Sequence, residues 1–307
     1  MDKTNKVSSF ITEDIAYFLG LIVGRGTIIN ANELKKLVID FPFKNLKAES
    51  PIEGKKYDNL LYLSNSLDKI VVRLLKLGVN LRKENDDANR SVSLIIEWRY
   101  PDLTWLFINY LLNDEFTNYH EFRIPKAIFQ CDKEKQKEFI RGLFDVTGHA
   151  RASNYAFDKK DNHHRVYFEI DNQNWFLTLD LFHLLTNLDV PVQTINFGHP
   201  NFRDPNHTKK GTAWAKEHQF KIFANQYLRI GSYLQHKQEV LQDLANLCPI
   251  GLGDDKGPQK KRVREKPSHT DESSQKLPAL LRNKHFNHYT ELLDFLKKND
   301  PIEPYGS

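Results

Sequence analysis

A helix that contains one glycine and ends at another occurs twice in this sequence, and this repeat limits what the chain can fold into. Residues 17–28 and residues 139–148 each place a glycine, Gly20 or Gly142, between large apolar side chains and then continue into a strand-like segment. Glycine inside a helix costs about 1 kcal/mol relative to alanine, so a repeated glycine needs a compensating gain. Close approach of two helix backbones supplies that gain. We therefore expect the two helices to pack together, rather than to be unrelated buried helices.

The boundaries of the first of these helices are also visible in the sequence. Thr12 is followed by Glu13 and Asp14, and a capping hydroxyl followed by two acidic residues favours a helix start. The glycines Gly26 and Gly148 suit the C-terminal ends of the two helices. The first helix is therefore expected to run to about residue 25.

These stretches resemble the two LAGLIDADG motifs of single-chain homing endonucleases. Residues 123–128 contain an Ile-Pro pair, which commonly precedes the second motif in that family. The resemblance covers roughly residues 10–245. It implies that two motif helices lie side by side at a pseudo-twofold axis, with the small residues Gly20, Gly24 and Gly142 at their contact.

The resemblance implies an α+β fold in which two pseudo-symmetric αββαβα lobes form a DNA-binding saddle. We expect the first lobe in residues 1–120 and the second in residues 121–247. Within the first lobe, the pattern of apolar residues predicts a helix over residues 66–78, a loop over residues 82–87 and a strand over residues 91–98.

The composition changes after the second lobe. Residues 248–274 are poor in large apolar side chains and contain a basic run that includes Lys260, Lys261 and Arg262. This composition is typical of a flexible arm that could follow DNA phosphates or simply act as a solvated linker. Residues 277–298 predict a short helical piece that cannot form a core alone and is expected to dock on the main body or on a partner. The third region of the chain is therefore residues 248–307.

The sequence departs from the family at the catalytic position. The family's metal-binding carboxylate precedes the final glycine of each motif, and this chain has Arg25 and Thr147 there. Asp145 matches an earlier acid of the motif, which caps and packs. Magnesium needs hard, preferably anionic oxygen ligands, and arginine can neither ligate a cation nor lose its proton in proteins. The sequence therefore predicts a DNA-binding saddle without a metal-dependent cutting centre and without a cofactor.

The residues that read DNA are expected on the strands and loops of the saddle. Strands in the major groove distinguish bases with Arg, Lys, Asn and Gln side chains. The candidate contacts are Asn30, Asn32, Lys35, Lys36, Arg151, Ser153, Asn154, Arg165, Gln193, Asn196, Arg203, Lys209, Lys210, Lys260, Lys261 and Arg262. For several of these lysines and for the long segment 199–218, an ordinary solvated surface is the alternative interpretation.

Composition sets weak limits on location and partners. The formal net charge is +4 and the pI is near 8.8, which permits nucleic-acid binding without demonstrating it. There is no apolar run long enough for a transmembrane helix, and the first residues lead into no signal-peptide core. Cys131 and Cys248 give no support for a disulfide. We expect a cytoplasmic or nucleoid-associated monomer with no membrane contact.

Other chemistries find weaker support in the sequence. No pair of Cys or His residues has the spacing of a zinc site with a matching second half, and there is no Gly-rich phosphate loop of the Gly-x-x-x-x-Gly-Lys-Ser/Thr type. The best-supported function is therefore sequence-specific binding of double-stranded DNA without intrinsic cleavage. Such a protein could be the recognition component of a restriction or defence system, beside a separate nuclease subunit, or a domesticated regulator.

Three alternatives of other classes stay open at this point. The first is an active site-specific DNA endonuclease that holds Mg²⁺ with other acids, such as Asp145 or Glu169. The second is an RNA-binding splicing factor of the maturase type, which also tolerates loss of the catalytic acids. The third is a structural protein that uses the saddle for protein contacts.

Overall fold

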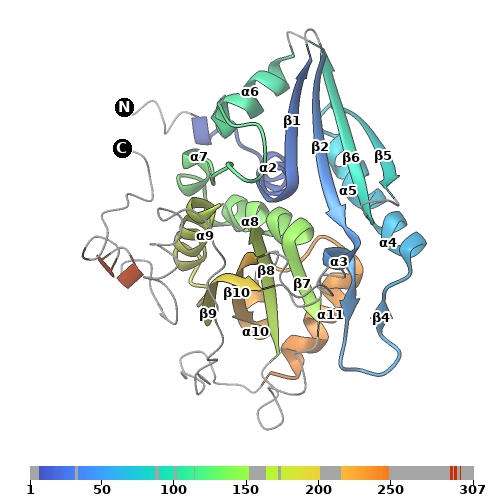
Figure 1. The fold of residues 1–307 in the computed structure, drawn as a ribbon, viewed down its shortest axis with the longest axis vertical. Helices are drawn as coiled ribbons and strands as arrows, with labels where there is room; N and C mark the ends of the chain where they lie inside the picture. Colours follow the sequence, from blue (N-terminus) through green and yellow to red (C-terminus); the bar gives the residue numbers. More distant parts are fainter. Residues whose placement is uncertain are drawn as a thin grey trace, which may run out of the picture.

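The computed structural model describes most of the two lobes and a few residues of the C-terminal region. The described residues are 7–31, 34–86, 90–99, 102–113, 115–151, 164–171, 174–200, 216–248, 291, 292, 294, 295 and 298. Over these residues the chain forms two β-sheets with helices packed between and around them (Figure 1). The expected two-lobed α+β architecture is confirmed.

Two long helices lie side by side at the centre of the molecule. They are α2 (Glu13–Arg25) and α8 (Lys133–Thr147), and they are adjacent in Figure 1. The side chain of Thr12 accepts a hydrogen bond from the backbone N–H of Ile15, so the expected N-cap is present. Asp132 caps α8 in the same way, through the backbone N–H of Lys135. These caps fix the starts of the two motif helices.

The first sheet has four antiparallel strands in the order β1-β2-β6-β5. The strands are β1 (Gly26–Ala31), β2 (Leu34–Pro42), β5 (Asn80–Asp86) and β6 (Ser91–Arg99). The strand β5 replaces the loop that the sequence predicted over residues 82–87. It lies at the edge of the sheet and alternates exposed with half-buried residues, and such charged edge strands resemble loops in composition.

The second sheet has six strands in the order β4-β3-β7-β8-β10-β9. The strands are β3 (Ala48–Glu49), β4 (Lys56–Tyr57), β7 (Gly148–Arg151), β8 (Arg165–Asp171), β9 (Thr194–Pro200) and β10 (Lys216–Phe223). The short strands β3 and β4 come from the first half of the chain, and β3 pairs in parallel with β7. The first lobe therefore contributes a hairpin to the sheet of the second lobe.

The remaining helices cover the sheets and complete the core. They are α3 (Phe43–Leu46), α4 (Leu60–Ser66), α5 (Asp68–Leu75), α6 (Leu103–Leu112), α7 (Lys126–Phe129), α9 (Trp175–Asn187), α10 (Ala224–Tyr227) and α11 (Gln235–Asn246). The helix predicted over residues 66–78 thus appears as α5, preceded by α4. None of the helices in the described residues is long and apolar enough to span a membrane.

The apolar core is continuous across both lobes and reaches the C-terminal region. Leu292 is fully buried in this core, and the partly buried Phe295 packs against it. The C-terminal region therefore docks on the main body at these two residues, which matches one of the two dockings expected for residues 277–298.

Candidate nucleic-acid interface

The contact between α2 and α8 is a backbone-to-backbone contact. A Cβ atom added to Gly20 would lie 2.0 Å from the carbonyl oxygen of Phe139, and one added to Gly142 would lie 2.1 Å from that of Tyr17. Real Cβ atoms do not approach other atoms this closely, so both positions require glycine. At Gly24 a Cβ would meet the side chain of Val146 at 2.5 Å. The three glycines singled out in the sequence therefore lie at the crossing of the two motif helices.

The glycines that end the motif helices have a different role from the one expected. Gly26 and Gly148 have φ angles of −84° and −87°, which any residue can adopt. A left-handed helix cap therefore does not explain them. A Cβ on Gly26 would lie 2.6 Å from the carbonyl oxygen of Ile22, and one on Gly148 would lie 2.0 Å from the ring of Phe144. Lack of space, rather than backbone conformation, demands glycine at both positions.

Asp145 is enclosed within the junction of the two lobes. Its carboxylate has no exposed surface and accepts hydrogen bonds from the hydroxyl of Tyr17 at 2.8 Å, the backbone N–H of Tyr233 at 3.1 Å and the hydroxyl of Ser232. Burial raises the pKa of this carboxyl, while Lys237 and the three donors oppose that change. Burial also raises the pKa of Tyr17 well above its usual range. This arrangement holds α2, α8 and the segment before α11 together.

A buried lysine that the sequence reasoning missed completes this junction. Lys237 has no exposed surface, and its ammonium group donates to the carbonyl oxygens of Phe144, Asp145 and Gly148 at 3.2, 3.0 and 2.9 Å. Burial lowers its pKa to about 8. A cation bonded to the final carbonyls of α8 is favourable because the helix dipole is negative there. Lys237 lies about 90 residues from its partners in the sequence, so no local pattern could have revealed it.

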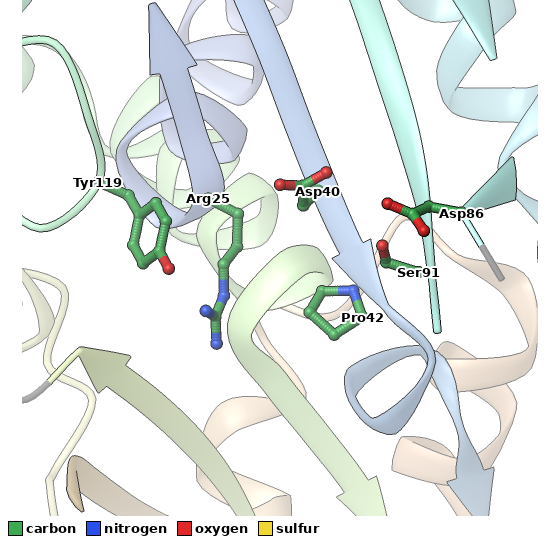
Figure 2. A pocket seen from close by; sticks show the side chains of 6 residues that line it. All are labelled: Arg25, Asp40, Pro42, Asp86, Ser91 and Tyr119. Carbon is green, nitrogen blue, oxygen red and sulfur yellow. The ribbon is translucent and has the colours of Figure 1, made fainter. Parts of the chain in front are cut away.

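Arg25 lies at the C-terminal end of α2, where its side chain is partly exposed. It lines a surface pocket of about 210 Å³ together with Asp40, Pro42, Asp86, Ser91 and Tyr119. The guanidinium carbon lies 5.2 Å from the centre of the Tyr119 ring, and Figure 2 shows the two side chains next to each other. This distance is within the range of a cation–π contact. A fixed positive charge therefore lies at the end of the first motif.

Thr147, at the equivalent position of the second motif, is not available to a ligand. It is 1% exposed, and its hydroxyl donates a hydrogen bond of 2.6 Å to the carbonyl oxygen of Leu143 one turn earlier. The residue before the final glycine is thus a partly exposed cation in the first motif and a buried, hydrogen-bonded hydroxyl in the second.

A cluster of charged residues surrounds the ends of the motif helices. The carboxylate of Glu169 lies 3.0 Å from the ammonium of Lys44 and 2.8 Å from Nε2 of His149, and Lys44 is also 3.7 Å from Glu217. Burial opposes ionisation of Glu169, but His149 and Lys44 outweigh burial and hold its pKa well below its usual range. Burial, together with the charge of Glu169, raises the pKa of Glu217 to about 8. Glu169 is therefore an ionised, internally neutralised carboxylate.

The candidate contacts on β1 and β2 divide between the two faces of the first sheet. Asn30, Lys35 and Trp98 lie opposite one another in the strand register, so their side chains share one face. Trp98 is buried against Trp105 of α6, which makes this the core face. Lys36 points to the other face. The structure therefore brings Lys36, but not Asn30 or Lys35, to the face opposite the core, which we call the open face.

The second sheet places several polar side chains on its own open face. Along β8, Arg165 and Tyr167 alternate with the buried residues Val166 and Phe168. Lys221 of β10 pairs with Tyr167 in the register, and its ammonium lies 5.9 Å from the centre of that ring. The sequence analysis named Arg165 but missed Lys221 and Tyr167, although the strand alternation could have found them.

Other predicted contacts are placed only in part or lie outside the described residues. Arg151 and Asn196 lie on β7 and β9, and only their backbones are described. Gln193 precedes β9, and its backbone N–H donates to the carbonyl oxygen of Lys221. The contacts predicted outside the described residues are Asn32, Ser153, Asn154, Arg203, Lys209, Lys210, Lys260, Lys261 and Arg262.

The described part of the chain contains no group of three or more His, Cys, Asp or Glu side chains arranged to hold a metal ion. The carboxylates around the ends of the motif helices are Asp145, Glu169 and Glu217, each buried or largely buried, and Asp40 and Asp86, which line the same pocket as the guanidinium of Arg25. Asp145 and Glu169 are also engaged by the donors described above. The residues at these positions therefore do not fit the divalent cation that the family resemblance implies.

Comparisons with known proteins give structural matches alone. No family model matches the chain, and no curated protein matches it. A structure of mesophilic variants of the homing endonuclease I-DmoI is 17% identical, with a TM-score of 0.37, and the match covers 75% of this chain and 95% of that chain. A structure of I-DmoI in complex with DNA and Ca is 18% identical, with a TM-score of 0.36, over 76% and 93% of the two chains. Full-length DUF199/WhiA from Thermatoga maritima is 13% identical, with a TM-score of 0.41, over 79% of this chain and 64% of that chain.

Proposed function

We propose that this protein binds double-stranded DNA in a sequence-specific manner and does not cut it. It would serve as the recognition component of a restriction or defence system, with a separate subunit for cleavage, or as a regulator. The observation that carries this proposal is the pair of residues at the ends of the two motifs. Where the resemblance implies metal-binding carboxylates, the chain has the cation Arg25 and the buried hydroxyl of Thr147.

Cations at this position favour a phosphate and disfavour a metal ion. The guanidinium of Arg25 offers several N–H donors in a planar array that matches phosphate oxygens, and it stays charged at any accessible pH. The ammonium of Lys44 is about half exposed, although the ionised Glu169 neutralises part of its charge. A duplex lying across the junction would therefore place a phosphate against the guanidinium of Arg25, which repels a divalent cation, while Asp40 and Asp86 line the other side of the same pocket.

The two open sheet faces supply the surface on which a duplex could lie. Antiparallel strands present a side chain of the same face at every second residue, and this spacing suits contacts to base edges in the major groove. On the second sheet, Arg165, Tyr167 and Lys221 occupy such positions. Arginine and lysine recognise guanine, and both also bind phosphates.

The endonuclease alternative requires an acid that reaches the scissile phosphate. Asp145 has no exposed surface, and three protein donors hold its carboxylate. Glu169 is 5% exposed and is held by Lys44 and His149. Either acid would have to lose these partners before it could ligate Mg²⁺. The geometry thus supports binding without cleavage.

A selection from a random pool of DNA duplexes tests the proposal directly. We expect one sequence to be bound at least about 10³-fold more tightly than random duplex, with an affinity that falls steeply as salt rises. The Arg165→Gln variant should bind more weakly, whereas Lys133→Gln, on the exposed start of α8, serves as a matched control. Equal binding to all duplexes would contradict the proposal. Preference for structured RNA would replace it with the splicing-factor alternative.

A further inference from the structure

The open faces of the two sheets carry different charges. On the first sheet, the described charged side chains of the open face are Lys36 and Arg82, with the carboxylates Asp40, Glu84, Asp86 and Glu97. The guanidinium of Arg82 lies 2.7 Å from Glu84 and 2.5 Å from Glu97, so its charge is neutralised within the sheet. The open face of the first sheet is therefore acidic over its described side chains.

That acidic face is partly apolar at the end where the β1–β2 hairpin turns. Ile29, opposite Lys36 in the register, is 45% exposed, and Leu34 is 40% exposed. Asp40 accepts a hydrogen bond of 2.6 Å from the hydroxyl of Ser93 on the neighbouring strand. A surface of this kind offers few cations to a phosphate backbone, and its carboxylates repel phosphates within a distance of about 8–10 Å at physiological salt.

The open face of the second sheet is positively charged at the end remote from the motif helices. Arg165 and Phe223 form a cross-strand pair there, with the guanidinium carbon 5.6 Å from the ring centre. The next pair on the same face is Tyr167 and Lys221. On β8 and β10 the open-face carboxylates Glu169, Asp171 and Glu217 all lie at the other end of the strands, next to the junction.

One open-face carboxylate of the second sheet, Glu169, is neutralised by its neighbours. Glu169 is engaged by His149 and Lys44, and Asp171 lies 3.0 Å from Nδ1 of His120. Beyond these strands, Glu49 of the β3–β4 hairpin pairs in register with Lys56. On β8 and β10, the cations Arg165 and Lys221 thus lie at the end of the open face that is remote from Glu169, Asp171 and Glu217.

We propose that the duplex is gripped and read asymmetrically, mainly by the open face of the second sheet together with Arg25 at the junction. This inference rests on the proposed DNA-binding function and names the half of the interface that carries it. Cations that contact phosphates supply most of the affinity, and they fix the register in which nearby side chains read bases. The half-site over the second sheet is specified in sequence, whereas the half-site over the first sheet is bound weakly and tolerates substitution.

A matched pair of substitutions separates the two sheets. Lys221→Gln and Lys36→Gln each remove one lysine charge from an open face, on β10 and β2 respectively. We expect Lys221→Gln to weaken binding of the selected duplex at least about tenfold. The slope of the logarithm of the binding constant against the logarithm of the salt concentration should also become shallower by about 0.9. We expect Lys36→Gln to weaken binding less than about threefold. Glu84→Gln should leave affinity unchanged or increase it, because it removes a charge that repels phosphate.

Footprinting on the selected duplex gives the second measurement. Hydroxyl-radical protection should cover the half-site over the second sheet and the centre, and the selected sequences should be uniform in that half-site alone. Arg165→Gln should relax the sequence preference within the same half-site. Equal protection and equal sequence uniformity on both sides, or an equal loss of affinity for Lys36→Gln and Lys221→Gln, would overturn the asymmetric interface. If the wild-type protein binds no duplex specifically, the proposed function itself fails instead.

Discussion

The hydroxyl of Tyr17 donates a hydrogen bond of 2.8 Å to the carboxylate of Asp145, and this bond joins the two motif helices inside the core. Both side chains have no exposed surface. The same carboxylate accepts from Ser232 and Tyr233, so one acid connects both halves of the repeat to the segment before α11. The acid that the sequence retains in the second motif therefore has a structural role.

Loss of this bond is expected to destabilise the fold. A buried hydrogen bond to a carboxylate contributes about 1.5–3 kcal/mol, so Tyr17→Phe should lower the free energy of unfolding by that amount. Asp145→Ala should cost more, about 3–5 kcal/mol, because it also leaves the buried Lys237 without an opposing charge. Urea unfolding measures both values. Tyr110→Phe, at a tyrosine that is 62% exposed, is the control and should change stability by less than about 0.5 kcal/mol.

Because the backbones of the motif helices touch where they cross, adding one methyl group at this crossing should strongly destabilise the fold. Gly142→Ala would place a Cβ 2.1 Å from the carbonyl oxygen of Tyr17, and only separation of the two backbones could relieve the clash. We expect a loss of at least about 3 kcal/mol, at the upper end of overpacking costs, or failure to fold. Gly78→Ala meets no atom within 4 Å and is strained only by its φ of +74°, so it should cost about 1–2 kcal/mol. Similar thermal midpoints for the two variants would show that the helices are not in backbone contact.

Because His236 is buried, the protein is expected to lose stability in mild acid. His236 is fully buried, its Nε2 lies 2.7 Å from the carbonyl oxygen of Leu46, and burial lowers its pKa to about 4. An unfolded histidine has a pKa of about 6.5, so between these values the unfolded chain binds a proton that the folded chain does not. Stability should therefore fall as the pH decreases, by about 2 kcal/mol between pH 7 and pH 5.

The contribution of His236 can be isolated by comparing urea unfolding at the two pH values in the wild type and in His236→Gln. The glutamine amide can still donate to the carbonyl oxygen of Leu46 but does not titrate. Between pH 7 and pH 5, the free energy of unfolding of the variant should decrease by about 2 kcal/mol less than that of the wild type. An identical pH dependence in both proteins would rule out titration of this side chain.

The junction predicts binding without cleavage. Incubation of the selected duplex with Mg²⁺ or Mn²⁺ should produce no nicks, because Arg25 repels a metal ion and Thr147 is buried. Arg25→Ala should weaken binding about tenfold, and Thr147→Ala should change it by less than about threefold. Strand scission that disappears in Asp145→Asn would instead support the endonuclease alternative.

The basic arm is predicted to add affinity without specificity. Replacement of Lys260, Lys261, Arg262, Arg264 and Lys266 by glutamine should weaken binding to all duplexes similarly and flatten the salt dependence. Substitution is preferable to truncation after residue 247, because truncation would also remove the buried Leu292 from the core. A change in the preferred sequence would show that the arm reads bases.

The sequence by itself determined the features that depend on residue type and short spacing. The repeated glycines predicted the helix contact, because only close backbone approach compensates for glycine inside a helix. Arg25 and Thr147 predicted that the motif ends would not hold a metal ion, because a side chain's ability to ligate a cation does not depend on the fold. Thr12 similarly gave the start of α2.

Only the tertiary structure decided which side chains share a site. A shift of one residue moves a strand side chain to the other face, so the open face could be assigned to Lys36, rather than Lys35, only through pairing with β6. The enclosure of Asp145 depends on Ser232 and Lys237, which lie far away in the chain. Such contacts arise when separate elements pack together, and they leave no periodic pattern in the sequence. The identity of the motif residues was therefore local information, whereas their burial and charge environment was not.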